Sequence, residues 1–401
     1  MSAPLIQSLE DVVVCDLTQN LAGPFCSQIL GDLGARIIKV EPPGGDPARA
    51  WGPPFWGKES TLFLSANRNK RSIVIDLKAE EGREVLGRIA RGSDVFIQSA
   101  RIGVPERLGY DYESIRALRD DMIHMSISAY GDRGPMKSLP GYDPLMQAFS
   151  GVMSVTGHAG GPPARAGGSV VDYGTGMWAA IAILGALRTR DRTGEGAKLD
   201  TALLDTAVLW ISYHLMGYLS TGQVPGPMGS GLGAIVPYQA FATSDGDVMI
   251  AAGNDGIYGR LCRALELDEL ADDERFATNP QRVAHRTELI PLLEEAIRPY
   301  ATSDFVELMQ ANSVPCSPIQ DVAQVAVDPQ VAAAELLVSA PTPEVPDYTD
   351  VALPLRVNGE RPRGESTPPA AGRHTVEILE EIGYSPSEID RLIATRIVES
   401  A

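Results

Sequence analysis

The first 130 residues alternate between short apolar runs and segments with helical spacing, and this alternation restricts the fold more than any other feature. Two segments, 23–34 and 79–91, carry apolar residues at helical intervals. Five apolar runs are typical of buried strands: 12–17, 36–41, 71–77, 94–98 and 122–130. Strands that alternate with helices predict βαβ units, and therefore an α/β fold with a largely parallel sheet.

The chain is expected to form more than one domain. Its 401 residues exceed one core of ordinary size. Two passages rich in glycine and proline, 220–239 and 340–370, flank a middle segment that opens with a new strand–helix unit. We therefore expect a smaller α/β domain inserted in a large one. The expected ranges are 1–205 and 333–401 for the large domain, 206–225 for a linker, and 226–332 for the small domain.

Charge and composition exclude several classes of protein. A net charge of −18 argues against a general nucleic-acid binder, although a local basic pocket for a phosphorylated cofactor remains compatible with it. The four cysteines are scattered, which indicates free thiols rather than a disulfide framework. No signal peptide and no run of 18 apolar residues is present, so we expect a cytoplasmic protein without a membrane span. The segment 177–190 is apolar nearly all round and predicts a buried helix.

The sequence lacks most of the familiar catalytic motifs. It has no P-loop, no GxGxxG at the start of a helix and no GxSxG turn. Its five histidines lack the spacing of metal ligands, so we expect no metal site. Carboxylates therefore become candidates for the reacting group.

One such carboxylate is Asp172, in the stretch "GGSVVDYGTG" at 167–176. A carboxylate can act as a covalent nucleophile towards an activated acyl group, and nearby glycines could leave it sterically open. The simpler interpretation of these ten residues alone is that Asp172 caps a helix and that the glycines permit close packing. The local sequence leaves both possibilities open.

Segments along nearly the whole chain resemble the family III CoA-transferases, the family of formyl-CoA transferase and carnitine CoA-transferase. They include "LAGPFCSQILGDLGARIIKVEPPGGDPAR" (21–49), "SISAYGDRGPMKSLPGYDPLMQAFSG" (126–151) and "PYQAFATSDGDVMIAAGND" (237–255). Shorter matches are "NRNKRSIVIDLK" (67–78), "PERLGYDYESI" (105–115) and "GRHTVEILEEIGY" (372–384). Their order is that of the family.

The resemblance implies that Asp172 is the nucleophile of a CoA-transferase. Its carboxylate would attack an acyl-CoA, and an enzyme-bound CoA thioester would pass CoA to a free carboxylic acid. Acyl-CoA and a small carboxylic acid would be the substrates, without ATP, metal or a tightly bound cofactor. Backbone N–H groups near Leu21, Ala22 and Asp172 are the expected donors to the developing oxyanions.

The same family contains α-methylacyl-CoA racemases, which move an α-proton between a histidine and the equivalent of Asp172. The position of that histidine is occupied here by Tyr142, a poor base at neutral pH, which favours transferase chemistry. Racemase or epimerase activity remains the alternative. A CoA-binding homologue without catalysis is a third hypothesis.

Further site residues follow from the resemblance. The glycine-rich loop 228–233, with Gly229, Ser230 and Gly231, matches a loop that covers the active site in transferases. Leu21 replaces a glutamine of formyl-CoA transferase, which weakens the case for oxalate or formate as substrate. The residues expected to contact CoA are Ile75, Lys78, Ser99, Arg101, Arg107, Leu139 and Tyr142. The fold implied is a large Rossmann-like domain and a small domain, in an interlocked homodimer.

Overall fold

The structure, a computed structural model, describes residues 8–342, 345–361 and 366–401. The chain divides into two compact units. The first unit consists of Met1–Ser150, Gly167–Ser212 and Pro329–Ala401. The second consists of Gly151–Ala166 and Tyr213–Asp328. Each unit is described by itself below.

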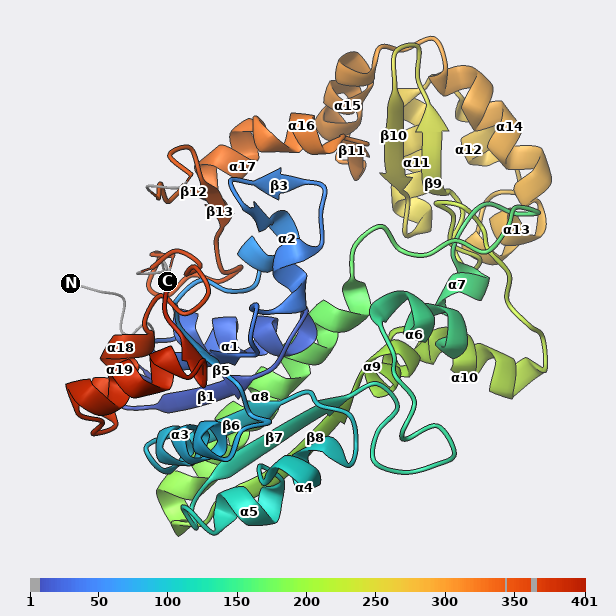
Figure 1. Cartoon of the computed structure of the whole chain (residues 1–401). Coiled ribbons are helices and arrows are strands. Elements are labelled where there is room, and N and C mark those ends of the chain that lie inside the picture. The colour runs from blue at the N-terminus through green and yellow to red at the C-terminus, as the bar shows by residue number, and fades with distance from the viewer. Residues whose placement is uncertain (1–7, 343–344, 362–365) are drawn as a thin grey trace. The chain divides into compact units, whose positions relative to one another are not determined.

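A seven-stranded sheet forms the centre of the first unit (Figure 1). The strand order is β14–β5–β2–β1–β6–β7–β8. Only β14 runs antiparallel to its neighbour; the other pairs are parallel, which confirms the expected α/β fold with a largely parallel sheet. The strands are β1 (Val13–Leu17), β2 (Arg36–Glu41), β5 (Lys70–Ile75), β6 (Val95–Gln98), β7 (Ile123–Ser128), β8 (Ala197–Ala202) and β14 (Val398–Glu399).

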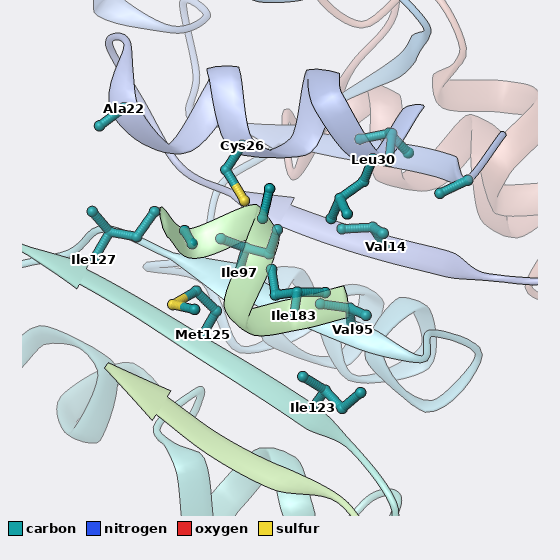
Figure 2. Close-up of a cluster of buried hydrophobic side chains, with 14 of the residues drawn as sticks. Val14, Ala22, Cys26, Leu30, Val95, Ile97, Ile123, Met125, Ile127 and Ile183 are labelled. Carbon is teal, nitrogen blue, oxygen red and sulfur yellow. The ribbon is translucent and has the colours of Figure 1, made fainter. Parts of the chain in front are cut away.

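Helices cover both faces of this sheet. Successive side chains of each strand point to opposite faces, and apolar side chains lie on both faces and have to be covered. Val14 packs with α1 (Ala22–Asp32) and α8 (Val170–Thr193) on one face. Figure 2 shows this core, with Cys26 and Leu30 of α1 facing Ile97, Met125 and Ile127 of the strands. On the other face, Val13 and Cys15 pack with α3 (Glu80–Arg91), α5 (Tyr112–Arg116), α18 (Thr375–Glu381) and α19 (Pro386–Ala394).

Shorter elements complete the first unit. They are α2 (Thr61–Leu64), α4 (Val104–Leu108), α6 (Asp143–Ser150), α9 (Leu203–Trp210), α17 (Pro329–Ala333), a 3-10 turn at Pro47–Ala50, and the hairpins β3 (Phe55–Trp56)–β4 (Glu59–Ser60) and β12 (Leu337–Ser339)–β13 (Thr349–Val351).

Helix α8 is longer and less buried than the helix expected at 177–190. It begins at Val170 and has 24 residues. One side packs against α1 and the sheet, but Met177, Trp178 and Ile181 stay exposed, so the helix that was expected to be buried is buried on one side only. Its apolar residues extend around the helix, and the neighbouring elements cover only part of them. By length and composition alone α8 could cross a membrane, a criterion that core helices also meet.

The second unit is built on a three-stranded antiparallel sheet with the order β11–β10–β9. Its elements are α7 (Val152–Val155), β9 (Tyr238–Ala242), β10 (Asp247–Ala251), α11 (Asp255–Ala264), α12 (Asp268–Asp272), α13 (Asn279–Ala284), α14 (Arg286–Ile297), α15 (Thr302–Ala311), β11 (Cys316–Pro318) and α16 (Val322–Ala326). Most of the expected linker 206–225 is helical, since α9 and α10 (Ser212–Thr221) occupy it. The other expected domain ranges stay predictions.

Candidate active site

A cavity of about 300 Å³ lies in the first unit where β1, β6 and β7 end and α1 and α8 begin. Asp172 lines it. The cavity also brings together six other residues predicted from the sequence: Leu21, Ala22, Ser99, Arg101, Leu139 and Tyr142. These residues come from four separate stretches of the chain, and parallel strands with their carboxyl ends at one edge make such a meeting point.

Asp172 lies in the first turn of α8 and does not cap it. The N-cap residue is Ser169, whose side chain makes no capping hydrogen bond. The exposed N–H groups are instead satisfied by Asp143 of α6: its Oδ2 accepts from Val171 N at 2.7 Å and from Asp172 N at 3.2 Å. The interpretation of Asp172 as a helix cap is therefore wrong, and its carboxylate is left facing the cavity.

A buried side chain of the same helix holds Asp143 in position. Gln147, one turn along α6, donates from Nε2 to Asp143 Oδ1 at 2.5 Å, and both side chains are buried. Sequence reasoning missed Asp143, although it directly follows Tyr142 in the segment that carries the resemblance.

The surroundings of Asp172 disfavour its charge. Burial and the charge of Asp143 raise the pKa of Asp172 to about 7. A carboxylate with a raised pKa is more basic and, once ionised, a better nucleophile than an ordinary aspartate. Both groups at the start of α8 are acidic, an arrangement that helix N-termini favour.

The glycines beside Asp172 serve packing rather than open space, contrary to one expectation. A Cβ on Gly174 would lie 2.5 Å from the Trp210 ring, and one on Gly176 would lie 2.5 Å from Ala22 O. Gly176 thus lets α8 approach the first turn of α1 closely. The close approach places Leu21 and Ala22 at the same cavity as Asp172.

Helix α1 presents free backbone donors at this cavity. Its N-cap residue is Leu21, which offers no side-chain acceptor to the first N–H groups. No hydrogen bond joins the N–H of Leu21 or Ala22 to another residue that the structure describes. The first N–H groups of a helix lack internal partners and attract negative charge. These two are therefore suited to stabilise an oxyanion near Asp172.

A buried ion-pair network holds the loop before α1. Lys39 Nζ lies 2.8 Å from Asp46 Oδ2 and donates to Thr18 O at 3.1 Å. Asp46 Oδ1 accepts from Asn20 N, whose residue has the left-handed φ of 68°. Lys39 and Asp46 are almost completely buried, so the loop conformation is strongly determined.

Two aromatic side chains form part of the cavity wall. The rings of Trp51 and Tyr142 lie 5.8 Å apart with an interplanar angle of 59°. Both line the cavity and remain more than 40% exposed, Trp51 at 44% and Tyr142 at 47%. Trp51 was missed by sequence reasoning because nothing near it in the sequence marks it.

A second cavity, of about 550 Å³, adjoins the first. The two share Gln19, Ser99 and Ala100. Ile75 and Lys78, both predicted to contact CoA, line the second cavity together with Pro42 and Pro43. The other predicted contact, Arg107 on α4, is exposed and lines neither cavity.

The glycine-rich loop lies in the second unit and is anchored there. Gly229 N donates to Gly157 O at 2.7 Å, Ala240 N donates to Ser230 Oγ at 2.8 Å, and Gly231 N donates to Met228 O at 3.0 Å. At its end, Arg286 Nη2 donates to Leu232 O at 2.5 Å. A role for this loop beside Asp172 stays a prediction.

In the described part of the chain, no group of three or more histidine, cysteine, aspartate or glutamate side chains is arranged to hold a metal ion.

Comparison with known proteins gives the family. The family described as "CoA-transferase family III" matches this chain over residues 9–375. Human succinyl-CoA:glutarate CoA-transferase is 38% identical over 396 residues, covering 98% of this chain and 90% of that protein. Succinate–glutarate CoA-transferase of Agrobacterium fabrum is 39% identical, covering 93% of this chain and 95% of that protein.

A solved structure agrees with this likeness. The crystal structure of a CAIB/BAIF family protein from Brucella suis superposes with a TM-score of 0.85 at 38% identity, covering 95% of this chain and all of that one. The chain therefore belongs to CoA-transferase family III and is a transferase enzyme.

Proposed function

We propose that this enzyme moves CoA from an acyl-CoA to a free carboxylic acid through a CoA thioester on Asp172. One observation carries the proposal. Asp143 accepts the hydrogen bonds from the start of α8, and Asp172 lines the same cavity as the free N–H groups of α1. The relatives named as succinyl-CoA:glutarate CoA-transferases support the same reaction class.

The first half of the reaction forms the enzyme thioester. A carboxylate oxygen of Asp172 attacks the thioester carbonyl, and the C–S bond breaks to give a mixed anhydride and CoA thiolate. The thiolate then attacks the Asp172 carbonyl carbon. The anhydride C–O bond breaks, and the donor acid leaves as a carboxylate.

The second half reverses these steps with the acceptor. The acceptor carboxylate attacks the Asp172 thioester and expels CoA thiolate, which then attacks the acceptor carbonyl of the new anhydride. The products are a new acyl-CoA and free Asp172 carboxylate. Each tetrahedral intermediate carries an oxyanion, for which Leu21 N–H and Ala22 N–H are the proposed donors.

CoA is proposed to occupy both cavities. The thioester would lie at Asp172 and the nucleotide end in the cavity lined by Ile75 and Lys78, with Ser99 on the path that joins them. Lys78 would supply a cation to a phosphate group.

Substitution of Asp172 tests the mechanism. With succinyl-CoA and glutarate as substrates, Asp172→Ala should abolish exchange, while wild-type enzyme incubated with succinyl-CoA should gain the mass of CoA on the peptide containing Asp172. Asp191→Asn, a carboxylate change at an exposed position of the same helix that lines neither cavity, is the matched control and should retain exchange. Full turnover by Asp172→Ala would refute the proposal.

Racemization is the weaker alternative because no histidine is among the described residues that line the cavity of Asp172. It would require a second base opposite Asp172, and the candidate there is Tyr142, a phenol. Deuterium uptake at the α-carbon of a 2-methylacyl-CoA in heavy water, without an acceptor acid, would favour it over transfer.

We also propose that the enzyme is a homodimer, in the interlocked form that the resemblance implies. Met177, Trp178 and Ile181 of α8, with Leu209 and Trp210 of α9, are large apolar side chains left exposed in the first unit. A concentration of such side chains on two consecutive helices is typical of a protein interface.

A further inference from the structure

Two buried basic side chains hold the two ends of α1. Arg68 precedes β5, and Lys70 is the first residue of that strand. Arg68 contacts Asp32, the last residue of α1, whereas Lys70 contacts Pro24 in the first turn. About 12 Å of helix separates these two contacts, at 1.5 Å per residue. Only the first turn carries the backbone donors proposed for the oxyanion.

Lys70 has a hydrogen-bond acceptor for each N–H group of its ammonium. Its Nζ donates to Pro24 O at 2.8 Å, to Asn67 Oδ1 at 2.9 Å and to Asp16 Oδ2 at 3.3 Å. All four residues are buried, and Lys70 does not line the cavity of Asp172. Lys70 can therefore influence the reaction only through the residues that it holds, and its contact with α1 is the one to Pro24 O.

Pro24 O belongs to the turn that carries the two free donors. Phe25 N donates to Leu21 O at 2.8 Å and closes this turn. The N–H groups of Leu21 and Ala22 are therefore joined to Pro24 by one hydrogen-bonded loop of backbone. Figure 2 shows Ala22 at this end of α1. A displacement of Pro24 O should displace both donors.

Asp16 connects Lys70 to the other groups around this turn. Its Oδ1 accepts from Thr18 N at 2.9 Å, and its Oδ2 accepts from the hydroxyl of Ser27. The same hydroxyl lies 3.1 Å from Pro24 O. A Cβ on Gly23 would lie 2.3 Å from Thr18 Cβ, so the turn packs directly against Thr18. The position of the first turn is thus set by a buried polar cluster on its inner side.

The hydrogen bond to Pro24 O does not require a charged Lys70. Burial lowers the pKa of Lys70 to about 7, although the charge of Asp16 acts in the opposite direction. A neutral amine still has two N–H groups, enough for Pro24 O and Asn67 Oδ1. The contact therefore persists on both sides of pH 7, and we expect no separate limb of the pH profile from this residue.

Arg68 forms the corresponding contact at the far end of α1. Its Nε and Nη2 donate to the two carboxylate oxygens of Asp32 at 2.8 and 2.6 Å, and both side chains are buried. Its Nη1 donates to Asp350 Oδ1 and Val351 O of β13. None of these four residues is among those that line the cavity of Asp172. Arg68 therefore stabilises α1 without touching the turn that carries the donors.

We propose that Lys70 is a positioning residue of the reaction, whose hydrogen bond to Pro24 O places the two free N–H groups of α1 at the oxyanion. The inference rests on the proposed transfer through Asp172. No bond to Lys70 forms or breaks during turnover. Oxyanion donors stabilise the transition state more than the bound substrate, so a displaced turn should slow the chemistry and leave substrate binding unchanged.

Rapid-quench kinetics of the first half-reaction separate binding from chemistry. Enzyme is mixed with succinyl-CoA over a range of concentrations, without acceptor, and the CoA thioester on Asp172 is quantified by mass spectrometry. Lys70→Met should lower the maximal rate of thioester formation about 10- to 100-fold, the effect of misplaced oxyanion donors. The half-saturating concentration of succinyl-CoA should change by less than about threefold.

Arg68→Met is the matched control. Each substitution leaves a buried carboxylate without its cation, so both variants should have a lower Tm than wild type. Arg68→Met should nevertheless keep the maximal rate within about twofold. Rates are compared at a temperature at which circular dichroism shows every variant to be folded.

Ser27→Ala decides the question if Lys70→Met does not fold. It removes the hydroxyl that contacts Pro24 O and Asp16 but leaves Lys70 in place. Loss of one hydrogen bond in the cluster should lower the maximal rate about threefold to tenfold, again with an unchanged half-saturating concentration.

Three results would overturn the proposal: an unchanged maximal rate in Lys70→Met, a change confined to the half-saturating concentration, or equal losses of rate in Lys70→Met and Arg68→Met. Where Lys70→Met is unfolded, an unchanged rate in Ser27→Ala has the same meaning. All of these results leave transfer through Asp172 intact, because that mechanism fails only if Asp172→Ala retains exchange.

Discussion

At the scale of single residues, the pair of Asp143 and Asp172 decides how the site depends on pH. Asp143 accepts hydrogen bonds from the N–H groups of Val171 and Asp172. The burial of Asp172 and, second to it, the charge of Asp143 raise the pKa of Asp172 to about 7. The nucleophile has to be ionised. The pH profile of kcat/KM should therefore rise as pH increases through about 7 and level off above it.

The variant Asp143→Asn tests the origin of that profile. It removes the charge but retains an oxygen that can accept from the start of α8. The pKa of Asp172 should fall, and the rising limb of kcat/KM should move to lower pH. Steady-state rates between pH 5 and 9 measure this shift, and an unmoved limb would show that Asp143 does not set the ionisation of the nucleophile.

The raised pKa of Asp172 also predicts a cost in stability. Its folded pKa, about 7, lies above the ordinary value of 3.8, so the folded state binds the proton more tightly. Stability from this group is present below pH 4 and is lost as pH rises through 7. Asp172→Asn avoids the loss and should raise Tm at pH 8 by about 1 °C for each kcal/mol recovered, the shift expected for a chain of 401 residues.

At pH 4 the same variant should show no such gain, since Asp172 is then neutral in the wild-type enzyme as well. Thermal unfolding followed by circular dichroism at both pH values provides the comparison. A variant that is equally or less stable than wild type at pH 8 would contradict the assignment.

At the scale of elements, the contact between α1 and α8 assembles the site. Gly176 has no room for a Cβ, because Ala22 O would be 2.5 Å away. Gly176→Ala should push α1 and α8 apart, lower Tm and reduce kcat by misplacing the backbone donors of α1.

Gly87 in the middle of α3 is the matched control. A Cβ there meets only Leu118 Cδ1, at an ordinary contact distance of 4.0 Å. Gly87→Ala should stabilise the enzyme by about 0.5–1 kcal/mol through better helix propensity and leave kcat unchanged. Thermal unfolding and steady-state assays distinguish the two variants. Equal Tm and kcat values for the two would show that the close approach at Gly176 does not contribute to the site.

The elements themselves were largely predictable from sequence. The stretch 36–41 coincides with a strand, Arg36–Glu41, because its apolar residues Ile37, Ile38 and Val40 are buried on the two faces of the sheet. The close approach at Gly176 was not predictable, since it depends on a contact with Ala22, more than 150 residues away. The same is true of Trp51 and Asp143: each reaches the site through the fold, without a local pattern.

At the scale of the whole molecule, the exposed apolar side chains of α8 and α9 remain to be accounted for. Ile181 is 56% exposed and Trp178 is 41% exposed, although both belong to a helix that by length and composition is apolar enough to cross a membrane. Sequence patterning cannot separate a helix buried in its own core from one buried by a partner, because both are apolar all round. The proposed homodimer would cover these side chains.

A charge in this surface tests the homodimer. Ile181→Glu would bury a carboxylate in an apolar interface, and such a burial costs several kcal/mol unless the dimer dissociates. We expect a shift from dimer to monomer, or a dissociation constant raised by orders of magnitude, measured by analytical ultracentrifugation over a range of concentrations. Val376→Glu, at an exposed position of α18, introduces the same charge elsewhere and should leave the mass unchanged. Because Ile181 points away from the core of its own chain, circular dichroism should show a folded variant; a folded Ile181→Glu enzyme that remains a dimer would place the interface on another surface.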